Sequence, residues 1–364
     1  MKMKVDILVP YLSGQGGMET VAKKVVEFYS KNQEIEVRLV IPQGTIRKEW
    51  ISDITNNILY NDSKLKIKLS RNLWGLFYLI NYLIFHTRDT DIVIGMSSRL
   101  VRIISIYRKV LKKNFLLVSW IHFSIDHEDA VRIKDIKKAD YHLAISSGIK
   151  RQLVREGISS NKIELIYNPV EKTDESISSS KSDTLELLYM GRVMLDGQKN
   201  LRELFLALSR LKISWHLKLV GDGNQMQNAQ NLAKELGIKN KIDFCGWLRD
   251  PWKQITNVDY LLLTSKYEGL PMVLIEAIER GLPCIAANCP TGPEDIIDER
   301  NGYLYEVGNI KSLVNKLIIA DKNKYKYQKN TVKNTATKFL EENYFVRLTE
   351  FLKEIKKNEG IKHL

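Results

Sequence analysis

The sequence predicts an α/β protein built from two doubly wound domains, each with a parallel sheet covered by helices. Apolar runs of strand length alternate with helical stretches along most of the chain, which is typical of such sheets. The alternation is interrupted by one polar, serine-rich segment, and 364 residues exceed what one small core accommodates. We therefore expect an N-terminal domain over residues 1–170, a linker over 171–183 and a C-terminal domain over 184–343.

The first domain opens with a buried strand at 5–10, a glycine loop at 13–17 and a helix at 18–30. Apolar runs predict its later strands at 36–41, 91–95, 115–120, 141–145 and 162–167.

In the second domain, five short apolar runs predict strands at 185–190, 217–220, 242–245, 260–263 and 283–286. Near the chain end, four apolar residues follow helical spacing and predict a helix that packs one face: Tyr344, Leu348, Phe351 and Ile355. In open α/β sheets ligands lie beyond the carboxyl ends of the strands, so we expect the two domains to face each other across a cleft for two substrates.

Composition points to a reducing compartment. Three cysteines without close paired spacing are typical of a cytoplasmic protein and argue against a zinc site. The N-terminus enters a strand directly, without the features of a signal peptide. The longest apolar run, 73–85, is shorter than a membrane-spanning helix requires.

Positive charge is concentrated in the first half of the chain. The net charge is +13, of which residues 1–170 carry +10, and residues 62–113 hold 11 basic and 3 acidic side chains among aromatic stretches. This pattern suits peripheral contact with an anionic cytoplasmic membrane surface, and a solvated helix face explains it equally well. No signature of a nucleic-acid module is present, so we expect no nucleic-acid partner.

Residues 267–276 place Glu268 in a loop and Glu276 inside the helix that follows. Pro271 suits the first helical position, where its missing amide costs nothing, and the free amides of Met272 and Val273 suit a diphosphate. Glu276, about a turn and a half along the helix, suits the hydroxyls of a ribose. A buried helix with two solvated acids is the competing interpretation.

Two cations, Arg192 and Lys199, follow the first strand of the second domain. Together they suit a diphosphate and would stabilise charge on a departing phosphate without a metal. An ion pair with Asp196 is the alternative. Turns at 220–223, with Asp222, and at 243–247, with Phe244 and Cys245, also suit a nucleotide, although turn formation alone explains their glycines.

In the first domain, Gly16 and Gly17 allow close backbone approach to a ligand, and His122 follows a strand. A structural histidine remains the alternative. The acidic triplet 89–91 precedes its strand, away from the expected cleft, and is interpreted as turn residues.

Taken together, these motifs resemble the retaining glycosyltransferases of family GT4, which have the GT-B fold. The likeness covers most of the chain in the family's order: Gly16-Gly17, His122, Gly191-Arg192, Lys199-Asn200, Gly221 to Gly223, Phe244, Gly246 and Glu268 to Glu276. Segments 289–294 and 301–304 look like the bacterial branch that builds lipopolysaccharide, capsule or lipid-linked oligosaccharide.

The resemblance implies transfer of galactose, glucose or an N-acetylhexosamine from a UDP-sugar to a glycan or lipid-linked acceptor, with retention and without a metal or other cofactor. It implies that the C-terminal helix, about 344–364, crosses back to the first domain. It assigns catalytic roles to Arg192, Lys199, Glu268 and His122, of which Glu268 and His122 contact the hexose. The expected substrate-binding residues are Gly16, Gly17, Asp222, Phe244, Cys245, Gly269, Leu270, Pro271, Met272 and Glu276. A UDP-sugar epimerase and a non-catalytic partner or membrane-docking subunit of the same fold remain alternatives.

Overall fold

The chain forms two compact units, each built around its own sheet. This computed structural model describes residues 2–12, 16–52, 54, 57–61, 68–126 and 131–362. Residues 13–15 of the predicted glycine loop, 62–67 of the basic segment and 363–364 of the C-terminal helix lie outside these ranges. The first unit comprises residues 1–168 with 345–364, and the second comprises 169–344.

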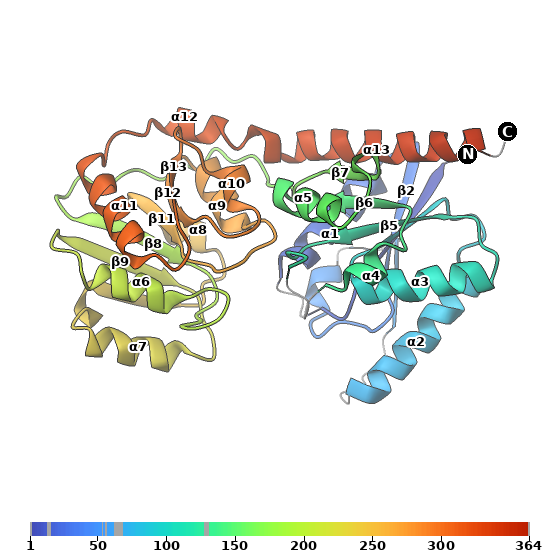
Figure 1. Ribbon diagram of the computed structural model, residues 1–364, viewed down its shortest axis with the longest axis horizontal. Helices are drawn as coiled ribbons and strands as arrows, with labels where there is room; N and C mark the ends of the chain where they lie inside the picture. The colour runs from blue at the N-terminus through green and yellow to red at the C-terminus, as the bar shows by residue number, and fades with distance from the viewer. Residues whose placement is uncertain are drawn as a thin grey trace. The chain divides into compact units, whose positions relative to one another are not determined.

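The first unit contains a seven-stranded sheet in which every strand pair is parallel, with the order β3-β2-β1-β4-β5-β6-β7 (Figure 1). Its strands are β1 (Met3–Leu8), β2 (Ile35–Ile41), β3 (Ile58–Tyr60), β4 (Ile92–Gly95), β5 (Leu116–Ile121), β6 (Tyr141–Ala144) and β7 (Ile163–Leu165). Its helices are α1 (Gly17–Ser30), α2 (Lys68–Phe85), α3 (Ser98–Val110), α4 (Ile133–Ile136) and α5 (Ser147–Arg155), with the 3-10 turns η1 (Glu49–Ile51) and η2 (Ser160–Lys162).

A six-stranded parallel sheet of order β10-β9-β8-β11-β12-β13 forms the second unit. Its strands are β8 (Leu185–Met190), β9 (Trp215–Val220), β10 (Ile242–Gly246), β11 (Tyr260–Leu263), β12 (Cys284–Ala287) and β13 (Gly302–Tyr305). Its helices are α6 (Leu201–Leu208), α7 (Met226–Glu235), α8 (Pro251–Gln254), α9 (Met272–Glu279), α10 (Pro293–Ile296), α11 (Ile310–Lys322) and α12 (Lys329–Asn334), with η3 (Lys239–Lys241) and η4 (Thr337–Phe339).

Both strand orders reverse direction at one internal point, so the predicted doubly wound α/β class is confirmed. In the second unit, α6 packs against α7 and α11, whereas α9 packs against α10 and α12 on the other side of the sheet (Figure 1). Because both faces are covered, the central strands are buried on both sides and read as continuous apolar runs. These runs are the reason that the sequence located eleven of the strands.

The strands β3 and β13 were not predicted. β3 has only three residues, all partly or fully exposed, at the edge of its sheet, so it lacks a buried run. β13 begins with Gly302, where a side chain would bring a Cβ atom to 2.1 Å from the Cys284 carbonyl oxygen. That glycine permits the close pairing with β12, although a glycine inside a strand normally argues against one.

The C-terminal helix α13 (Glu341–Lys362) begins in the second unit, and its residues from Phe345 onward belong to the first. The Phe345 ring stacks on Phe28 at 3.7 Å between centroids, and the hydroxyl groups of Thr349 and Tyr29 share a 2.7 Å hydrogen bond. Its apolar stripe is buried, as the spacing of these residues predicts.

Residues 171–183, predicted as a linker, lie entirely within the second unit, so the boundary falls earlier, after Asn168. They have no regular structure, but their backbone is held by side chains of that unit. The Ser180 amide donates to the buried Asp259 carboxylate at 2.8 Å. The polar composition of residues 171–183 indicated that the segment has no apolar core of its own, but it did not indicate these hydrogen bonds.

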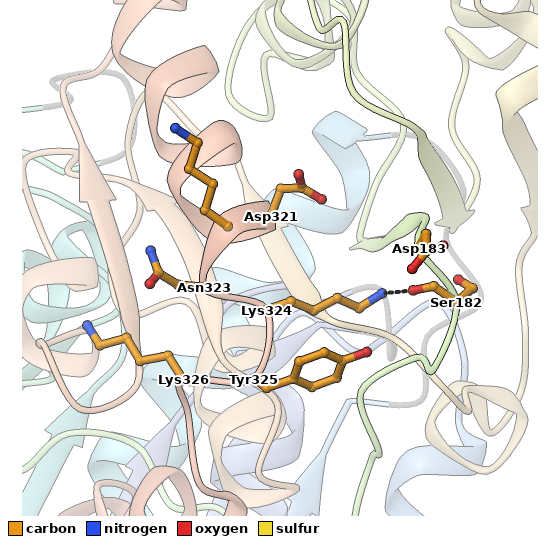
Figure 2. A pocket seen from close by; sticks show the side chains of 8 residues that line it. Ser182, Asp183, Asp321, Asn323, Lys324, Tyr325 and Lys326 are labelled. Atoms are coloured by element: carbon orange, nitrogen blue, oxygen red, sulfur yellow. Dashed lines mark hydrogen bonds between the residues drawn. The ribbon is translucent and has the colours of Figure 1, made fainter.

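Lys324 forms hydrogen bonds with the C-terminal end of the segment 171–183. In the surface pocket shown in Figure 2 its ammonium group points to Ser182, and it donates to the carbonyl oxygens of Ser182 at 2.7 Å and Thr184 at 2.8 Å. The same group lies 3.0 Å from the Asp259 carboxylate, which is fully buried. Lys324 therefore neutralises a buried charge and satisfies two carbonyl groups.

We expect Lys324→Met to destabilise the second unit by about 3–5 kcal/mol, because it leaves the Asp259 carboxylate buried without its cation. Urea unfolding measures the change. The exposed Lys322→Met variant is the control and should stay within about 0.5 kcal/mol of the parent. Equal stability of the two variants would contradict the role given to Lys324.

Within the described ranges, no helix combines the length and the hydropathy needed to cross a membrane.

Candidate active site

The donor-binding candidates of the second unit lie on loops and a helix at the carboxyl edge of its sheet. The strand order reverses between β8 and β11, and at such a switch point the loops diverge and leave room for a ligand. The loop after β8 carries Arg192 and Lys199, and the loop after β11 carries Glu268.

Glycines let the loops of this edge approach one another. A Cβ atom on Gly221, whose φ is +135°, would lie 1.9 Å from the carbonyl oxygen of Gly191. The Gly221 amide donates to the Gly246 carbonyl oxygen at 2.7 Å, and the Val193 amide donates to the Asp222 carbonyl oxygen at 3.0 Å. The loops after β8, β9 and β10 therefore form one hydrogen-bonded layer.

Lys199 and Glu268 form an ion pair at 2.7 Å, and both side chains are largely buried. Each partner is also held through its backbone: Thr264 donates to the Lys199 carbonyl oxygen at 2.9 Å, and Thr291 donates to that of Glu268. The alternative partner Asp196 instead binds Arg202, with two hydrogen bonds of 2.8 Å. A buried, preorganised ion pair thus lies at the switch point.

Arg192 is exposed and makes no ion pair with any residue that the structure describes. Its carbonyl oxygen accepts a 2.9 Å hydrogen bond from the buried Tyr189 hydroxyl. Burial and the Glu268 charge raise the pKa of Tyr189, whereas the Arg192 charge lowers it. The phenol therefore interacts electrostatically with both groups. Arg192 therefore presents a cation that no described carboxylate pairs with, on the same loop as Lys199.

Glu276 lies on α9, which begins at Met272; Pro271, predicted as the first helical residue, is the N-cap, so the helix begins one residue later than predicted. Pro271 provides no side-chain cap, so an external anion suits the first amides of the helix. A side chain at Gly292, where φ is +98°, would bring its Cβ atom to 2.6 Å from Pro271 Cδ. The loop after β12 therefore packs directly on the turn that contains Gly269, Leu270 and Pro271.

Trp252, which the sequence did not single out, positions Glu276. Its indole N–H donates to Glu276 Oε2 at 2.9 Å, and the Arg280 guanidinium lies 4.8 Å from its ring centroid. Arg280 also donates to the Glu276 carbonyl oxygen at 3.1 Å. A tryptophan 24 residues upstream of its partner gives no local signal, because the contact exists only in the fold.

The remaining second-unit candidates are more peripheral. The Phe244 ring packs edge-to-face against Phe205 of the core, with 6.4 Å between the ring centroids. Cys245 is exposed, and partial burial and the Asp243 charge raise the pKa of its thiol. Asp222 is exposed and accepts a 2.7 Å hydrogen bond from the Gly223 amide.

Gly16, Gly17 and His122 belong to the first unit. Gly16 precedes α1, and a Cβ atom there would lie 2.6 Å from a Glu19 carboxylate oxygen, whereas none of the described atoms lies within 4 Å of a Cβ atom on Gly17. His122 follows β5 and is 7% exposed, and its Nε2 atom has no hydrogen-bond partner among the described residues. Burial lowers the pKa of His122 to about 3, so its ring is neutral at pH 7 and suits hydrogen bonding rather than proton storage.

Two buried histidines predict that the first unit loses stability in acid. Burial lowers the pKa of His122 to about 3 and that of His142 to about 4, whereas the unfolded chain titrates near 6.5. Their stabilising contribution is complete above pH 6.5 and is lost as the pH falls toward these folded values. Between pH 6.5 and 5 we expect a loss of about 2 kcal/mol per histidine, measured by urea unfolding.

The double variant His122→Asn with His142→Asn should remove most of this pH dependence between pH 6.5 and 5. A double variant with the parent's pH profile would show that the acid sensitivity arises elsewhere.

Comparison with known proteins gives a consistent pattern. Residues 170–338 match the family model of glycosyl transferases group 1. The chain is 35% identical to the lipopolysaccharide 1,6-galactosyltransferase of Salmonella typhimurium over 94% of its own length and 96% of that protein. It is 36% identical to the Escherichia coli enzyme of the same name, over 88% and 90% of the two chains.

Solved structures agree with this pattern. The apo form of the lipopolysaccharide outer core galactosyltransferase WaaB has a TM-score of 0.84 and 33% identity, with complete coverage of both chains. HepE of Anabaena in complex with UDP has a TM-score of 0.76 over 97% of this chain, and at 18% identity it supports the fold alone.

Proposed function

Because the chain belongs to the glycosyl transferase group 1 family, we propose that this glycosyltransferase moves a galactosyl residue from UDP-galactose to a lipopolysaccharide glycan. The two lipopolysaccharide 1,6-galactosyltransferases that cover most of the chain support galactose over the other hexoses that the sequence left open. The family resemblance and the GT-B fold predicted from the sequence are confirmed.

The observation that carries the donor assignment is the buried Lys199–Glu268 pair at the switch point, with the exposed Arg192 on the same loop as Lys199. In this proposal Arg192 and Lys199 bind the diphosphate, and the turn at 269–272 offers it backbone amides. Glu276 accepts hydrogen bonds from the ribose, and Glu268 accepts them from the hexose. Asp222, Phe244 and Cys245 lie toward the nucleotide.

The proposed reaction proceeds with retention and without a metal. The bond between the anomeric carbon and the donor phosphate oxygen breaks, and its electron pair stays on that oxygen, where Arg192 and Lys199 stabilise the charge. The acceptor hydroxyl oxygen bonds to the anomeric carbon on the same face, and its proton passes to the leaving phosphate. The neutral His122 contributes a hydrogen bond to the hexose, and Gly16 and Gly17 admit the phosphates to close backbone contact.

We further propose a cytoplasmic location at the inner face of the membrane, with a glycan or lipid-linked acceptor. The concentration of positive charge in residues 1–170 supports peripheral contact with anionic lipid.

The test combines a donor panel with product analysis. We expect transfer from UDP-galactose to galactose-deficient lipopolysaccharide in preference to UDP-glucose and UDP-N-acetylglucosamine, an α-linked product from the α-linked donor by NMR, and full activity in EDTA. A β-linked product would exclude retention, and activity restored only by added Mg²⁺ or Mn²⁺ would exclude the metal-free mechanism. Conversion of the UDP-sugar without acceptor would indicate an epimerase, and absence of any turnover would indicate a non-catalytic partner.

A further inference from the structure

Helix α2 presents an apolar stripe to solvent. Leu69, Leu73 and Phe77 follow one another at intervals of four residues on one face, and each is more than half exposed. Trp74, beside them, is also more than half exposed. The opposite face supplies Leu79, Tyr82 and Leu83 to the core of the first unit. A helix at a protein surface normally turns polar residues outward, so a helix that is apolar on both faces is expected to have a partner.

The neighbouring helix α3 adds positive charge to this stripe. It packs against α2 (Figure 1), and the Lys113 ammonium group, just after α3, donates to the Ile84 carbonyl oxygen at 3.2 Å. Arg99, Arg102 and Lys109 are exposed on α3 and are interleaved with the exposed Ile106. Residues 68–113 contain nine Lys and Arg against two Asp.

The apolar and cationic residues of α2 and α3 indicate which kind of partner this face binds. The Trp74 and Phe77 rings meet edge-to-face at 6.0 Å, and a tryptophan beside aliphatic residues and a cationic rim suits the boundary between headgroups and acyl chains. A second copy of the chain would oppose one cationic rim to another, and that arrangement is repulsive. An anionic bilayer satisfies both the apolar stripe and the charge.

We propose that α2 and α3 form a membrane-binding face, in which Leu69, Leu73, Trp74 and Phe77 enter the interfacial layer of an anionic bilayer. Arg99 and Arg102 contact the headgroups. The inference deepens the proposed function, because it names the surface that brings the chain to a membrane-borne acceptor. It assigns the binding to apolar insertion as well as to charge, so part of the binding should persist in high salt.

The test is flotation of the full chain with vesicles of phosphatidylcholine, alone or mixed with phosphatidylglycerol. We expect binding that requires phosphatidylglycerol and weakens in salt without disappearing. Trp74→Ser with Phe77→Ser should lower partitioning at least tenfold at every salt concentration. Arg99→Glu with Arg102→Glu should lower it by about 10- to 100-fold at low salt and remove the salt dependence.

The exposed Val154→Ser variant on α5 is the control and should bind like the parent. Thermal stabilisation by UDP, measured on every variant, reports that the fold and the donor site are intact. Parent-like flotation of the aromatic variant would overturn the proposal, as would binding that is indifferent to phosphatidylglycerol. A dimeric parent that the aromatic substitutions convert to a monomer would assign the face to a second copy instead. Vesicle binding without galactosyl transfer would keep this inference and reject the proposed function.

Discussion

Replacing Arg192 with alanine is expected to lower kcat for transfer by about 100-fold or more and to leave stability unchanged. The guanidinium is exposed and has no partner among the described residues. Its removal therefore leaves no buried charge unpaired and lowers the free energy of unfolding by at most about 0.5 kcal/mol. Loss of one group that stabilises charge on the leaving phosphate typically costs about 10²- to 10³-fold. Steady-state kinetics with UDP-galactose and urea unfolding measure the two effects.

Comparing Arg192→Ala with Lys199→Ala separates the effect on activity from the effect on stability. Activity should fall to a similar extent, but stability should also fall by about 3–5 kcal/mol, because Glu268 is left buried without its cation. Arg210→Ala, an exposed arginine that follows α6, is the matched control and should preserve both. Full activity of the Arg192 variant would refute the assignment of that cation to the diphosphate.

The second large effect is expected at Glu268, where Glu268→Gln should lower kcat about 100-fold while UDP binds nearly as tightly as before. In the proposed function this carboxylate binds the hexose, and UDP lacks that sugar. Calorimetric titration with UDP and kinetics with UDP-galactose make the comparison. An equal loss of UDP affinity would place Glu268 against the nucleotide instead.

Glu276→Gln should show the reverse pattern, with UDP affinity reduced about 10-fold or more, because a hydrogen bond to a charged group contributes about 1.5–3 kcal/mol. Trp252→Phe keeps a ring under Arg280 but removes the 2.9 Å hydrogen bond that orients the carboxylate. We expect it to weaken UDP by a smaller factor than Glu276→Gln. A Trp252 variant with unchanged affinity would reduce this residue to a packing role.

The fold was largely predictable because its information is local. Strands buried on both faces appear as short apolar runs, and Pro271 and the glycines mark the turns between them. The edge strand β3 was missed because three partly exposed residues form no such run, and β13 because Gly302 resembles a turn residue. The sequence did not indicate the hydrogen bonds that hold residues 171–183 to Asp259 and Lys324, because these side chains are more than 70 residues away.

The sequence places the candidate site residues near strand ends, but it does not show which of them are in contact. Arg192, Lys199 and Glu268 lie in loops that follow strands, and Glu276 lies inside the helix after Pro271, as the local sequence pattern predicts. That Lys199 pairs with Glu268, 69 residues away, depends on β8 lying beside β11, which is a property of the sheet order. The Trp252 contact is likewise absent from any local pattern, because α8 and α9 are separated in sequence by β11.

The first unit contains the first residues to be translated, but helix α13 makes it the last unit to be completed. Residues 345–362 are translated only after the whole second unit, and until then Tyr29 lacks Thr349 and Tyr141 lacks Phe351. The nascent first unit therefore carries an uncovered apolar strip during most of translation, when incomplete domains are prone to aggregate. Expression of residues 1–168 alone would preserve that unfinished state permanently.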